Sequence, residues 1–416
     1  MATSSFIDQI KAHSSAEVAE EYIKIFNSIT SSKNVIPSFY IKKNISKKVM
    51  VDALIQKKMQ QYKKKIITDE DINFIQNELT RYENCKFSSI NFAFIGNQLG
   101  EEKSKIFSKS ILNQFETKTG DFDIISYIGF LKYFSKTQYS MLHFIRIDET
   151  FNNIFTKKQL RDFIKLCIPQ ICSLKELSND FIEIYTIITS EYLIFDIYPV
   201  YINGFPVRDL LCSTMFRRFI EMDNFDLSTN PLSKHNVQEL YNLFQTYTSN
   251  DNGRHMQADL INKESLICIN SYHFTQVFID RLFETSCLVN CEYFDLTLFL
   301  RFYFSLMEMN KRNGTHFFFK LIDIDEDGMI GFSDILYFFK ANIDESGLEI
   351  DFESFLSEIY DLVSCNENYV SEEKLSESEK RSSFINLLID VNSFTNWARE
   401  DYIDDDIGIE QDDFYS

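Results

Sequence analysis

Four acidic residues in one short segment have the spacing of ligands to a metal ion. The segment reads Asp323-Ile-Asp325-Glu-Asp327-Gly-Met-Ile-Gly-Phe-Ser-Asp334, with acids at positions 1, 3, 5 and 12 and a glycine at position 6 for a sharp turn. Ca²⁺ is a hard cation that takes about six to eight oxygen ligands at roughly 2.3–2.6 Å. The pattern therefore predicts a calcium site whose ligands are the side chains of Asp323, Asp325, Asp327 and Asp334, the carbonyl of Met329 and a water held at Gly331.

Position 12 of this segment departs from the usual pattern, because Asp334 stands where such loops normally carry a glutamate. The shorter side chain reaches less far, so we expect weaker Ca²⁺ binding and stronger competition from Mg²⁺. Without a cation the four acids repel one another, which raises their pKa values and favours the binding of an ion. The alternative is that the segment forms only a turn that caps a helix beginning near Ser333.

The residues on both sides of the segment predict the elements that position it. Apolar residues before and after it recur at helical spacing, so each flank is expected to form a helix with one apolar face. A helix, a twelve-residue cation loop and a second helix together make an EF-hand. The apolar residues are Phe318, Phe319 and Ile322 before the loop and Ile335, Phe338 and Phe339 after it.

The same apolar spacing recurs along the chain and indicates a repeated unit. A helix–loop–helix unit that cannot bury its own apolar face must pack against a neighbour, and EF-hands do so in pairs. We therefore predict an all-α fold, built as an elongated array of about three pairs of EF-hand-like units, most of them degenerate. Chance matches among amphipathic helices are the alternative. The copies are anchored on Gly120, Asn153 and Glu292, with looser matches around Gly204, Gly253 and Asn368.

Most of these copies lack the ligands of a cation site. The copy around Asn153 offers Asp148, Thr150 and Asn152 and ends in Gln159, which with Thr156 forms a capping-box pattern, a structural role. At its ligand positions the copy around Gly253 has a single carboxylate, Asp259, and it begins with Thr248. Whether this copy binds a metal ion is left open.

Composition excludes several classes of protein. Among 416 residues there are only 11 glycines and 5 prolines, too few for the tight turns of a β-rich fold or the glycine loops of a nucleotide-binding fold. A net charge of −20 disfavours nucleic acid as a partner. The N-terminal sequence does not resemble a signal peptide, and no stretch of 18 apolar residues exists, so we expect a cytoplasmic or nuclear protein. Motifs of catalysis are absent, and an enzyme is not expected.

Cysteine usage fits the same compartment, where thiols stay reduced. Cys287 and Cys291, with His273 upstream, supply at most half of a zinc site, and we interpret them as buried free thiols.

One segment is positively charged, although the protein as a whole is negatively charged. From Lys33 to Lys65 there are ten lysines and one acid, Asp52. Ahead of most of them lies an extended apolar hook, since Pro37 disfavours a helical Ile36. The hook and the lysines are candidates for binding an acidic partner, and a solvated helix face is the alternative for the lysines. The candidate partner-binding residues are Ile36, Pro37, Phe39, Tyr40, Lys57, Lys58, Lys63, Lys64 and Lys65.

These features divide the chain into five parts. We expect an N-terminal segment (1–32), the hook with a basic helical arm (33–66), a first EF-hand-like domain with degenerate loops (67–225), a second EF-hand domain that contains the intact loop 323–334 (226–400), and an acidic disordered tail (401–416).

The order of these parts resembles the B″ regulatory subunits of protein phosphatase 2A. The resemblance rests on Ile36-Pro-x-Phe-Tyr40, on the run of degenerate units, and on the stretch from Phe317 to Ile330. The segments 358–363 and 384–394 resemble the gamma branch, which includes the plant FASS/TONNEAU-type proteins. The similarity spans about residues 36–400. Two positions depart from the family: Ser38 replaces a usually basic residue, and Thr248 an acid.

The resemblance implies a non-catalytic, calcium-binding subunit that docks on the scaffold and catalytic subunits of the phosphatase and directs them to phosphoprotein substrates. Such subunits act at centrosomes, microtubules or the nucleus, so the resemblance implies a cytoplasmic protein with a cytoskeletal or centrosomal role. Two alternatives remain open at this point: a stand-alone EF-hand calcium sensor, and a cytoskeletal adaptor without a phosphatase partner.

Overall fold

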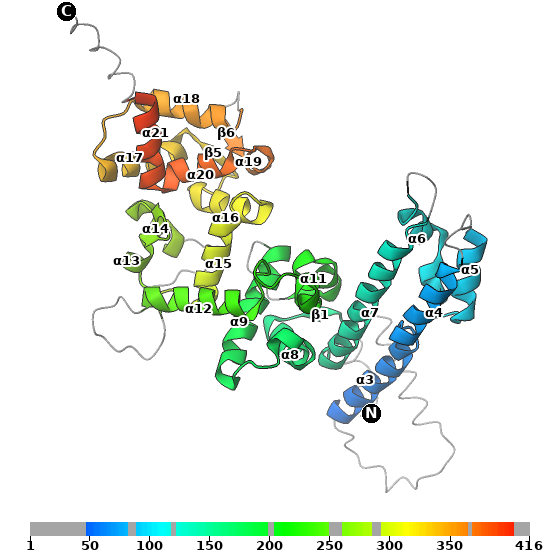
Figure 1. The fold of residues 1–416 in the computed structure, drawn as a ribbon. Coiled ribbons are helices and arrows are strands. Elements are labelled where there is room, and N and C mark those ends of the chain that lie inside the picture. Colours follow the sequence, from blue (N-terminus) through cyan, green and yellow to red (C-terminus); the bar gives the residue numbers. More distant parts are fainter. Residues whose placement is uncertain are drawn as a thin grey trace, which may run out of the picture. The chain divides into compact units, whose positions relative to one another are not determined.

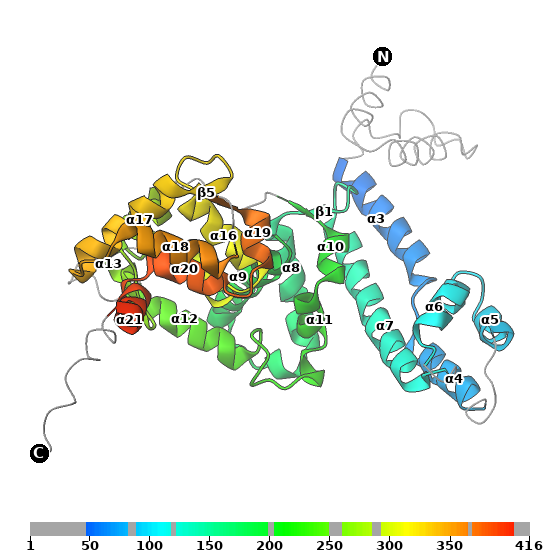
Figure 2. The same cartoon turned by 90° about the horizontal axis from the view of Figure 1, so that it is seen from above.

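The computed structural model describes residues 47–81, 89–117, 122–198, 204–248, 260–284, 293–364 and 368–402. Contacts divide the chain into two units, one made of residues 1–176 and 204–227 and the other of residues 177–203 and 228–416 (Figures 1 and 2). The described part of each unit is mostly helical, which confirms the predicted helical class. The domain limits expected from the sequence remain a prediction.

The first unit is built around one long helix. Helix α7 (Ile124–Ile147) contacts α3, α4, α8 and α11, and both views show α3 alongside it (Figures 1 and 2). The other elements are α3 (Lys47–Lys63), α4 (Asp69–Thr80), α5 (Ser89–Gln98), η1 (Ser104–Phe107), α6 (Lys109–Gln114), β1 (Ile154–Phe155), α8 (Lys157–Cys167), η2 (Ile168–Gln170), η3 (Cys172–Leu174), β2 (Phe205–Pro206), α10 (Val207–Cys212), α11 (Thr214–Ile220) and η4 (Met222–Asn224).

Aromatic packing and local caps explain why these helices form where they do. The rings of Phe144 on α7 and Phe163 on α8 are stacked with centroids 4.1 Å apart, so the two helices are joined by buried apolar surface. Helix α8 begins with a capping box, in which the Thr156 side chain accepts from the backbone N–H of Gln159 and the Gln159 side chain accepts from that of Thr156. This capping box is the one predicted from the sequence.

The second unit contains the segment 323–334, the predicted cation loop, and a core rich in phenylalanine. The core includes Phe278, Phe302, Phe318 and Phe338. Its elements are α9 (Asn179–Ile197), α12 (Lys234–Thr248), α13 (Lys263–Leu266), β3 (Cys268–Ile269), β4 (Tyr272–His273), α14 (Gln276–Glu284), α15 (Leu296–Met307), α16 (Arg312–Ile322), β5 (Met329–Gly331), α17 (Phe332–Ser346), α18 (Phe352–Leu362), β6 (Tyr369–Ser371), α19 (Glu372–Glu377), α20 (Arg381–Ile389) and α21 (Val391–Tyr402).

A buried ion pair holds α9 within this unit. The guanidinium of Arg301 on α15 lies 3.5 Å from the carboxylate of Glu191 on α9, and both side chains are almost fully buried. Two charges removed from water are tolerated only when they satisfy each other, so the pair fixes how the two helices pack. Residues 177–198 thus pack with the second unit although they precede residues 204–227 of the first.

Short antiparallel strands join loops that are far apart in the sequence. In the first unit β1 pairs with β2, so that Phe155 lies opposite Phe205. In the second, β5 pairs with β6 and Ile330 lies opposite Val370. These four residues are buried, so each strand pair carries an apolar contact between the loops it joins.

The copy around Gly253 differs from its expected alignment. In the intact loop the paired residue Ile330 comes two residues after Gly328, whereas here Ile261, eight residues after Gly253, exchanges two backbone hydrogen bonds of 2.9 Å with Phe294. More residues separate Ile261 from the end of α12 than separate Ile330 from the end of α16.

Among the described helices, none is long and apolar enough to cross a membrane.

Candidate metal centre

The loop 323–334 has a backbone shaped for close approach of its carboxylates. It leaves α16 at Asp323 and enters α17 after Gly331. Glu326 and Gly328, at positions 4 and 6, adopt positive φ angles of 59° and 86°. At Gly328 this conformation causes no steric strain, because glycine has no Cβ. The N–H of Gly328 donates to Oδ2 of Asp323 at 3.0 Å, which folds the loop back onto its first residue.

Three carboxylates meet inside this turn. Asp323, Asp325 and Asp327 each offer an oxygen, and these atoms all lie within 4.8 Å of one another. Backbone donors orient two of them: the N–H of Asp327 donates to Asp325 Oδ1 at 3.3 Å, and that of Met329 donates to Asp327 Oδ1 at 2.7 Å. Asp325 and Asp327 are exposed, whereas Asp323 is buried beneath them. The group is therefore open to solvent on one side.

The electrostatics of Asp323 indicate what the group needs. Its Oδ1 is buried and has no hydrogen-bond partner. Burial raises the pKa of this carboxyl above its usual range, and the charges of Asp327 and Asp334 raise it further, against the opposing Gly328 N–H and Lys320. A cation bound among the three acids would satisfy the buried oxygen and neutralise the repulsion. The donor set, all carboxylate and carbonyl oxygen, suits a hard divalent cation.

Asp334 has a different position from the other three acids. Its Oδ1 accepts from the N–H of Ile324 at 2.9 Å and its Oδ2 from that of Gly331 at 2.8 Å. Within the described part of the chain, the carboxylate group formed by the other three does not include it. The remaining predicted ligands, Met329 and Gly331, lie in strand β5. Whether these residues complete a metal site stays a prediction.

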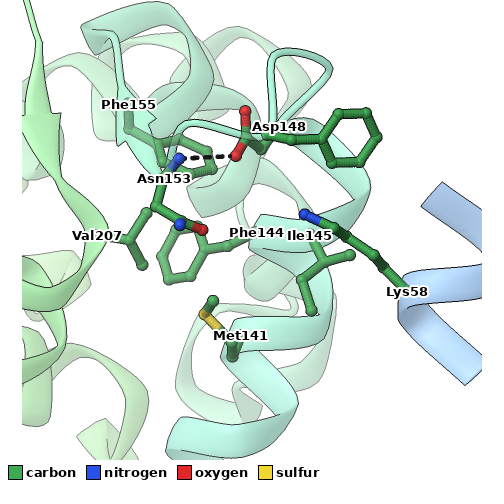
Figure 3. A pocket seen from close by; sticks show the side chains of 9 residues that line it. Lys58, Met141, Phe144, Ile145, Asp148, Asn153, Phe155 and Val207 are labelled. Atoms are coloured by element: carbon green, nitrogen blue, oxygen red, sulfur yellow. Dashed lines mark hydrogen bonds between the residues drawn. The ribbon is translucent and has the colours of Figure 1, made fainter. Parts of the chain in front are cut away.

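The loop 148–159 in the first unit repeats the same backbone with different side chains. Phe151 and Asn153, again at positions 4 and 6, have φ angles of 56° and 57°. The N–H of Asn153 donates to Oδ2 of Asp148 at 3.0 Å, as drawn in Figure 3. The Thr150 hydroxyl lies 2.8 Å from Asp148 Oδ1 and 2.9 Å from Asn152 Oδ1. The side chains at positions 1, 3 and 5 thus bind one another.

Lys58 covers this second loop. Its Nζ lies 4.5 Å from the centre of the Phe151 ring, within the range of a cation–π contact. The side chain also lines a small pocket beside Asp148 and Asn153, where Figure 3 shows it reaching over from α3. Lys58 therefore contributes to the packing of its own unit.

The other candidate partner-binding lysines are exposed. Lys57 and Lys63 lie on α3, and Lys64 and Lys65 directly follow it, with Lys65 in a loose ion pair with Glu102 at 3.9 Å. The apolar hook formed by Ile36, Pro37, Phe39 and Tyr40 lies outside the described residues, as do residues 403–416 of the acidic tail and the thiols of Cys287 and Cys291.

One contact beside the metal loop has no signal in the sequence. His316 on α16 lies with Nδ1 2.7 Å from Glu372 Oε1 on α19, the helix that follows strand β6. It adds a polar link to the β5–β6 pairing, so the helix that enters the metal loop is tied to the segment that pairs with the loop. The packing of α16 against α19 brings these residues together, and no local pattern marks them.

Comparisons with known proteins agree with the resemblance drawn from the sequence. No family model matches the chain. The chain is 23% identical over 428 residues to the B″ gamma regulatory subunit of protein phosphatase 2A from Xenopus tropicalis, covering 93% of this chain and 92% of that protein. It is 22% identical over 391 residues to the human gamma subunit, covering 88% and 84%. The probable B″-type regulatory protein TON2 of Arabidopsis thaliana is 21% identical over 324 residues, covering 73% and 66%.

A solved structure supports the same fold. A chain described as part of a PP2A PR70 holoenzyme superposes with a TM-score of 0.51 at 14% identity, covering 59% of this chain and 94% of that one. At this identity the likeness concerns the fold alone. The resemblance to the B″ subunits, including gamma and TON2-type members, is confirmed.

Proposed function

We propose that this chain is a non-catalytic regulatory subunit of the B″ type, which binds the scaffold and catalytic subunits of protein phosphatase 2A and directs them to phosphoprotein substrates. The observation that carries the proposal is the extent of the similarity: 93% of the chain aligns with 92% of a B″ gamma subunit. A relation confined to one EF-hand would cover only a short segment of each protein. Similarity from end to end supports a shared role of the whole chain.

The architecture supports the proposal at a finer level. Strand pairs β1–β2 and β5–β6 each join two loops through buried apolar residues, which is how paired EF-hand-like units pack. We infer an array of such pairs in which loop 323–334 binds Ca²⁺, with Mg²⁺ as a competitor, through Asp323, Asp325 and Asp327. Asp334, the Met329 carbonyl and a water at Gly331 complete the proposed site.

The proposed docking residues lie at the N-terminal end. The hook supplies apolar side chains at Ile36, Phe39 and Tyr40, and the exposed lysines 57, 63, 64 and 65 supply positive charge on a protein of net charge −20. Charges of this kind speed the encounter with an acidic surface more than they tighten the final complex. The proposed site of action is the cytoplasm, at cytoskeletal or centrosomal structures.

Reconstitution tests the proposed function. The full chain is mixed with purified phosphatase scaffold and catalytic subunits, and the assembly is followed by size-exclusion chromatography and by the rate of association at several salt concentrations. We expect one stable three-subunit complex. Phe39→Ala should weaken it without changing the thermal unfolding midpoint of the free chain, because the hook is proposed to contact the partner.

The lysines provide a second arm of the same experiment. Changing Lys57, Lys63, Lys64 and Lys65 together to Gln should lower the association rate and flatten its salt dependence, since screened attraction fades beyond a Debye length of about 8 Å at physiological salt. Lys58 is kept, because its contact with Phe151 belongs to the fold. A chain that binds Ca²⁺ but forms no complex would instead be a free-standing sensor, and a chain that binds only cytoskeletal filaments would be an adaptor.

A further inference from the structure

We propose that Arg281 on α14 is a positioning residue for loop 323–334, because it holds the backbone at the point where the chain enters the loop. The inference rests on the proposed cation site and concerns a residue outside the loop. The Nη2–H of Arg281 donates to the carbonyl oxygen of Asp323 at 3.2 Å, and its Nε–H donates more weakly to that of Leu321 at 3.4 Å. The arginine side chain is half-buried.

Both carbonyls lie at the end of α16, where a helix leaves its last carbonyl groups without partners of its own. A cationic side chain at a helix C-terminus satisfies such groups and interacts favourably with the helix dipole. Asp323 is thereby held at both ends, since Arg281 binds its carbonyl and the N–H of Gly328 binds its carboxylate at 3.0 Å. Its Oδ1, the buried oxygen without a hydrogen-bond partner, is therefore held in a defined position.

Loop 148–159, called the neutral loop because its positions 3, 5 and 12 are uncharged, holds its own entry. The side-chain amide of Gln159, at position 12, donates to the carbonyl of Ile147 at the end of α7 at 3.3 Å. Loop 323–334 has Asp334 at position 12, and an ionised carboxylate can only accept hydrogen bonds. The donors at the end of α16 come instead from another helix, through Arg281.

Helix α14 is itself held against both helices that flank loop 323–334. The rings of Phe278 on α14 and Phe318 on α16 are stacked with centroids 6.1 Å apart. At the start of α14, the N–H of Gln276 donates at 2.7 Å to Oε1 of Glu345, which lies in the last turn of α17. Helix α14 thus connects the C-terminal ends of α16 and α17, and this packing fixes where Arg281 lies.

Two effects of Arg281 on cation binding have opposite signs. Its positive charge repels a cation in the loop, which lowers the affinity. Its hydrogen bonds hold the first ligand before the ion arrives, so less conformational freedom is lost on binding, which raises the affinity. Groups that orient metal ligands change the affinity by about 10- to 100-fold when they are removed. In this proposal the positioning effect outweighs the repulsion.

Calorimetric titration of the full chain with Ca²⁺ separates the two effects. Arg281→Gln should raise the dissociation constant by about tenfold, and Arg281→Lys, which keeps the charge but loses the planar fork, should give a smaller rise. Lys320→Gln is the matched control. Burial raises the pKa of Asp323 and the charge of Lys320 opposes that rise, so Lys320 acts on the loop through its charge. Its removal should leave the dissociation constant unchanged or lower it.

Hydrogen exchange at saturating Ca²⁺ gives a second readout. In the wild type Ca²⁺ should slow exchange in α14 as well as in α16 and α17, and in Arg281→Gln the slowing in α14 alone should be lost. A folded Arg281→Gln that binds Ca²⁺ at least as tightly as the wild type would overturn the inference, as would equal slowing of α14 in both proteins. Arg281→Lys is judged by the same two measurements if Arg281→Gln does not fold. A wild type that binds no Ca²⁺ would overturn the proposed cation site itself.

Discussion

Loops 148–159 and 323–334 have the same backbone conformation but differ in the side chains at positions 3 and 5, which are uncharged in the first loop and acidic in the second. Both have positive φ angles at positions 4 and 6, and in both the N–H at position 6 donates at 3.0 Å to a buried aspartate at position 1. In the first loop a threonine and an asparagine follow, and the threonine hydroxyl lies within hydrogen-bond distance of both the aspartate and the asparagine. In the second two aspartates follow, and one oxygen of Asp323 has no hydrogen-bond partner.

The two loops therefore share one backbone shape, although only loop 323–334 carries the three clustered acids. A single buried carboxylate at position 1, bonded to the amide at position 6, accompanies the turn in both units. The side chains at positions 3 and 5 then decide between an internally satisfied loop and one that needs an external positive charge. Three like charges within a few ångströms are unfavourable until a cation joins them.

The largest expected effect follows from removing position 1 of the charged loop. Asp323→Ala deletes the buried oxygen and the acceptor of the Gly328 N–H, so cation binding should be lost. We expect the wild type to bind Ca²⁺ at one site per chain, with a dissociation constant on the order of 10⁻⁶–10⁻⁴ M. Calorimetric titration measures both. Asp148→Asn, the equivalent change in loop 148–159, should leave the titration unchanged. Two equivalents of Ca²⁺ bound by the wild type would contradict the prediction that only loop 323–334 binds a cation.

The next effect is stabilisation of one unit and not the other. A ligand that binds only the folded state at a hundred times its dissociation constant stabilises that state by about 2.7 kcal/mol. Hydrogen exchange followed by mass spectrometry, with Ca²⁺ and with a chelator, should show slower exchange in α16 and α17 when Ca²⁺ is present. Exchange in α7 and α8 should not change. Equal protection in both units would mean that the loops are not chemically distinct.

A smaller effect is expected when the neutral loop is given charges. Thr150→Asp combined with Asn152→Asp places three acids on the backbone frame around Asp148 and removes the hydroxyl that bridges positions 1 and 5. Without a cation the variant should be less stable by about 1–3 kcal/mol, because hydrogen bonds are lost and like charges are brought together. Thermal denaturation measures the loss. Calcium should restore part of it by binding the first unit, which it does not stabilise in the wild type, and a fully stable variant that binds no ion there would refute the proposed role of positions 3 and 5.

The smallest effect concerns Lys58. Its ammonium contacts the Phe151 ring in the neutral loop, a contact worth roughly 0.5–1 kcal/mol at a partly exposed site. Lys58→Gln should lower the free energy of unfolding by that amount, measured by chemical denaturation. Lys63→Gln on the same helix is the matched control and should have less effect, because its side chain is exposed. An unchanged free energy of unfolding in Lys58→Gln would mean that the contact with Phe151 does not stabilise the fold, and Lys58 would then be a candidate partner-binding residue like the exposed lysines.

Sequence reasoning reached the local features and missed the long-range ones. The helices around loop 323–334 and the capping box of Thr156 and Gln159 depend on residues a few positions apart, so the sequence pattern predicts them. The pairing of Ile261 with Phe294 follows no such pattern, because Ile261 comes eight residues after Gly253 whereas Ile330 comes two residues after Gly328. The ion pair of Glu191 and Arg301 likewise depends on how distant helices pack, which no local pattern encodes.

The candidate site shows the same division. The three acids at positions 1, 3 and 5 meet as their spacing predicts, since a single turn brings them together. The two backbone hydrogen bonds of Asp334 depend on the detailed path of the chain at positions 2 and 9, and the sequence marks only that the side chain is short. Nor does a run of lysines indicate which member folds over a neighbouring ring, as Lys58 does.

The central claim is that one loop takes a cation while its structural counterpart does not, and two amide protons report on it directly. The N–H groups of Gly328 and Asn153 have equivalent roles, each donating to the carboxylate at position 1 of its loop. Amide NMR spectra of the full chain, recorded during a Ca²⁺ titration, follow both protons in one sample. The Gly328 resonance should shift and saturate at one equivalent, with the Asn153 resonance unmoved. Shifts of both amides in parallel, or of neither, would contradict the account.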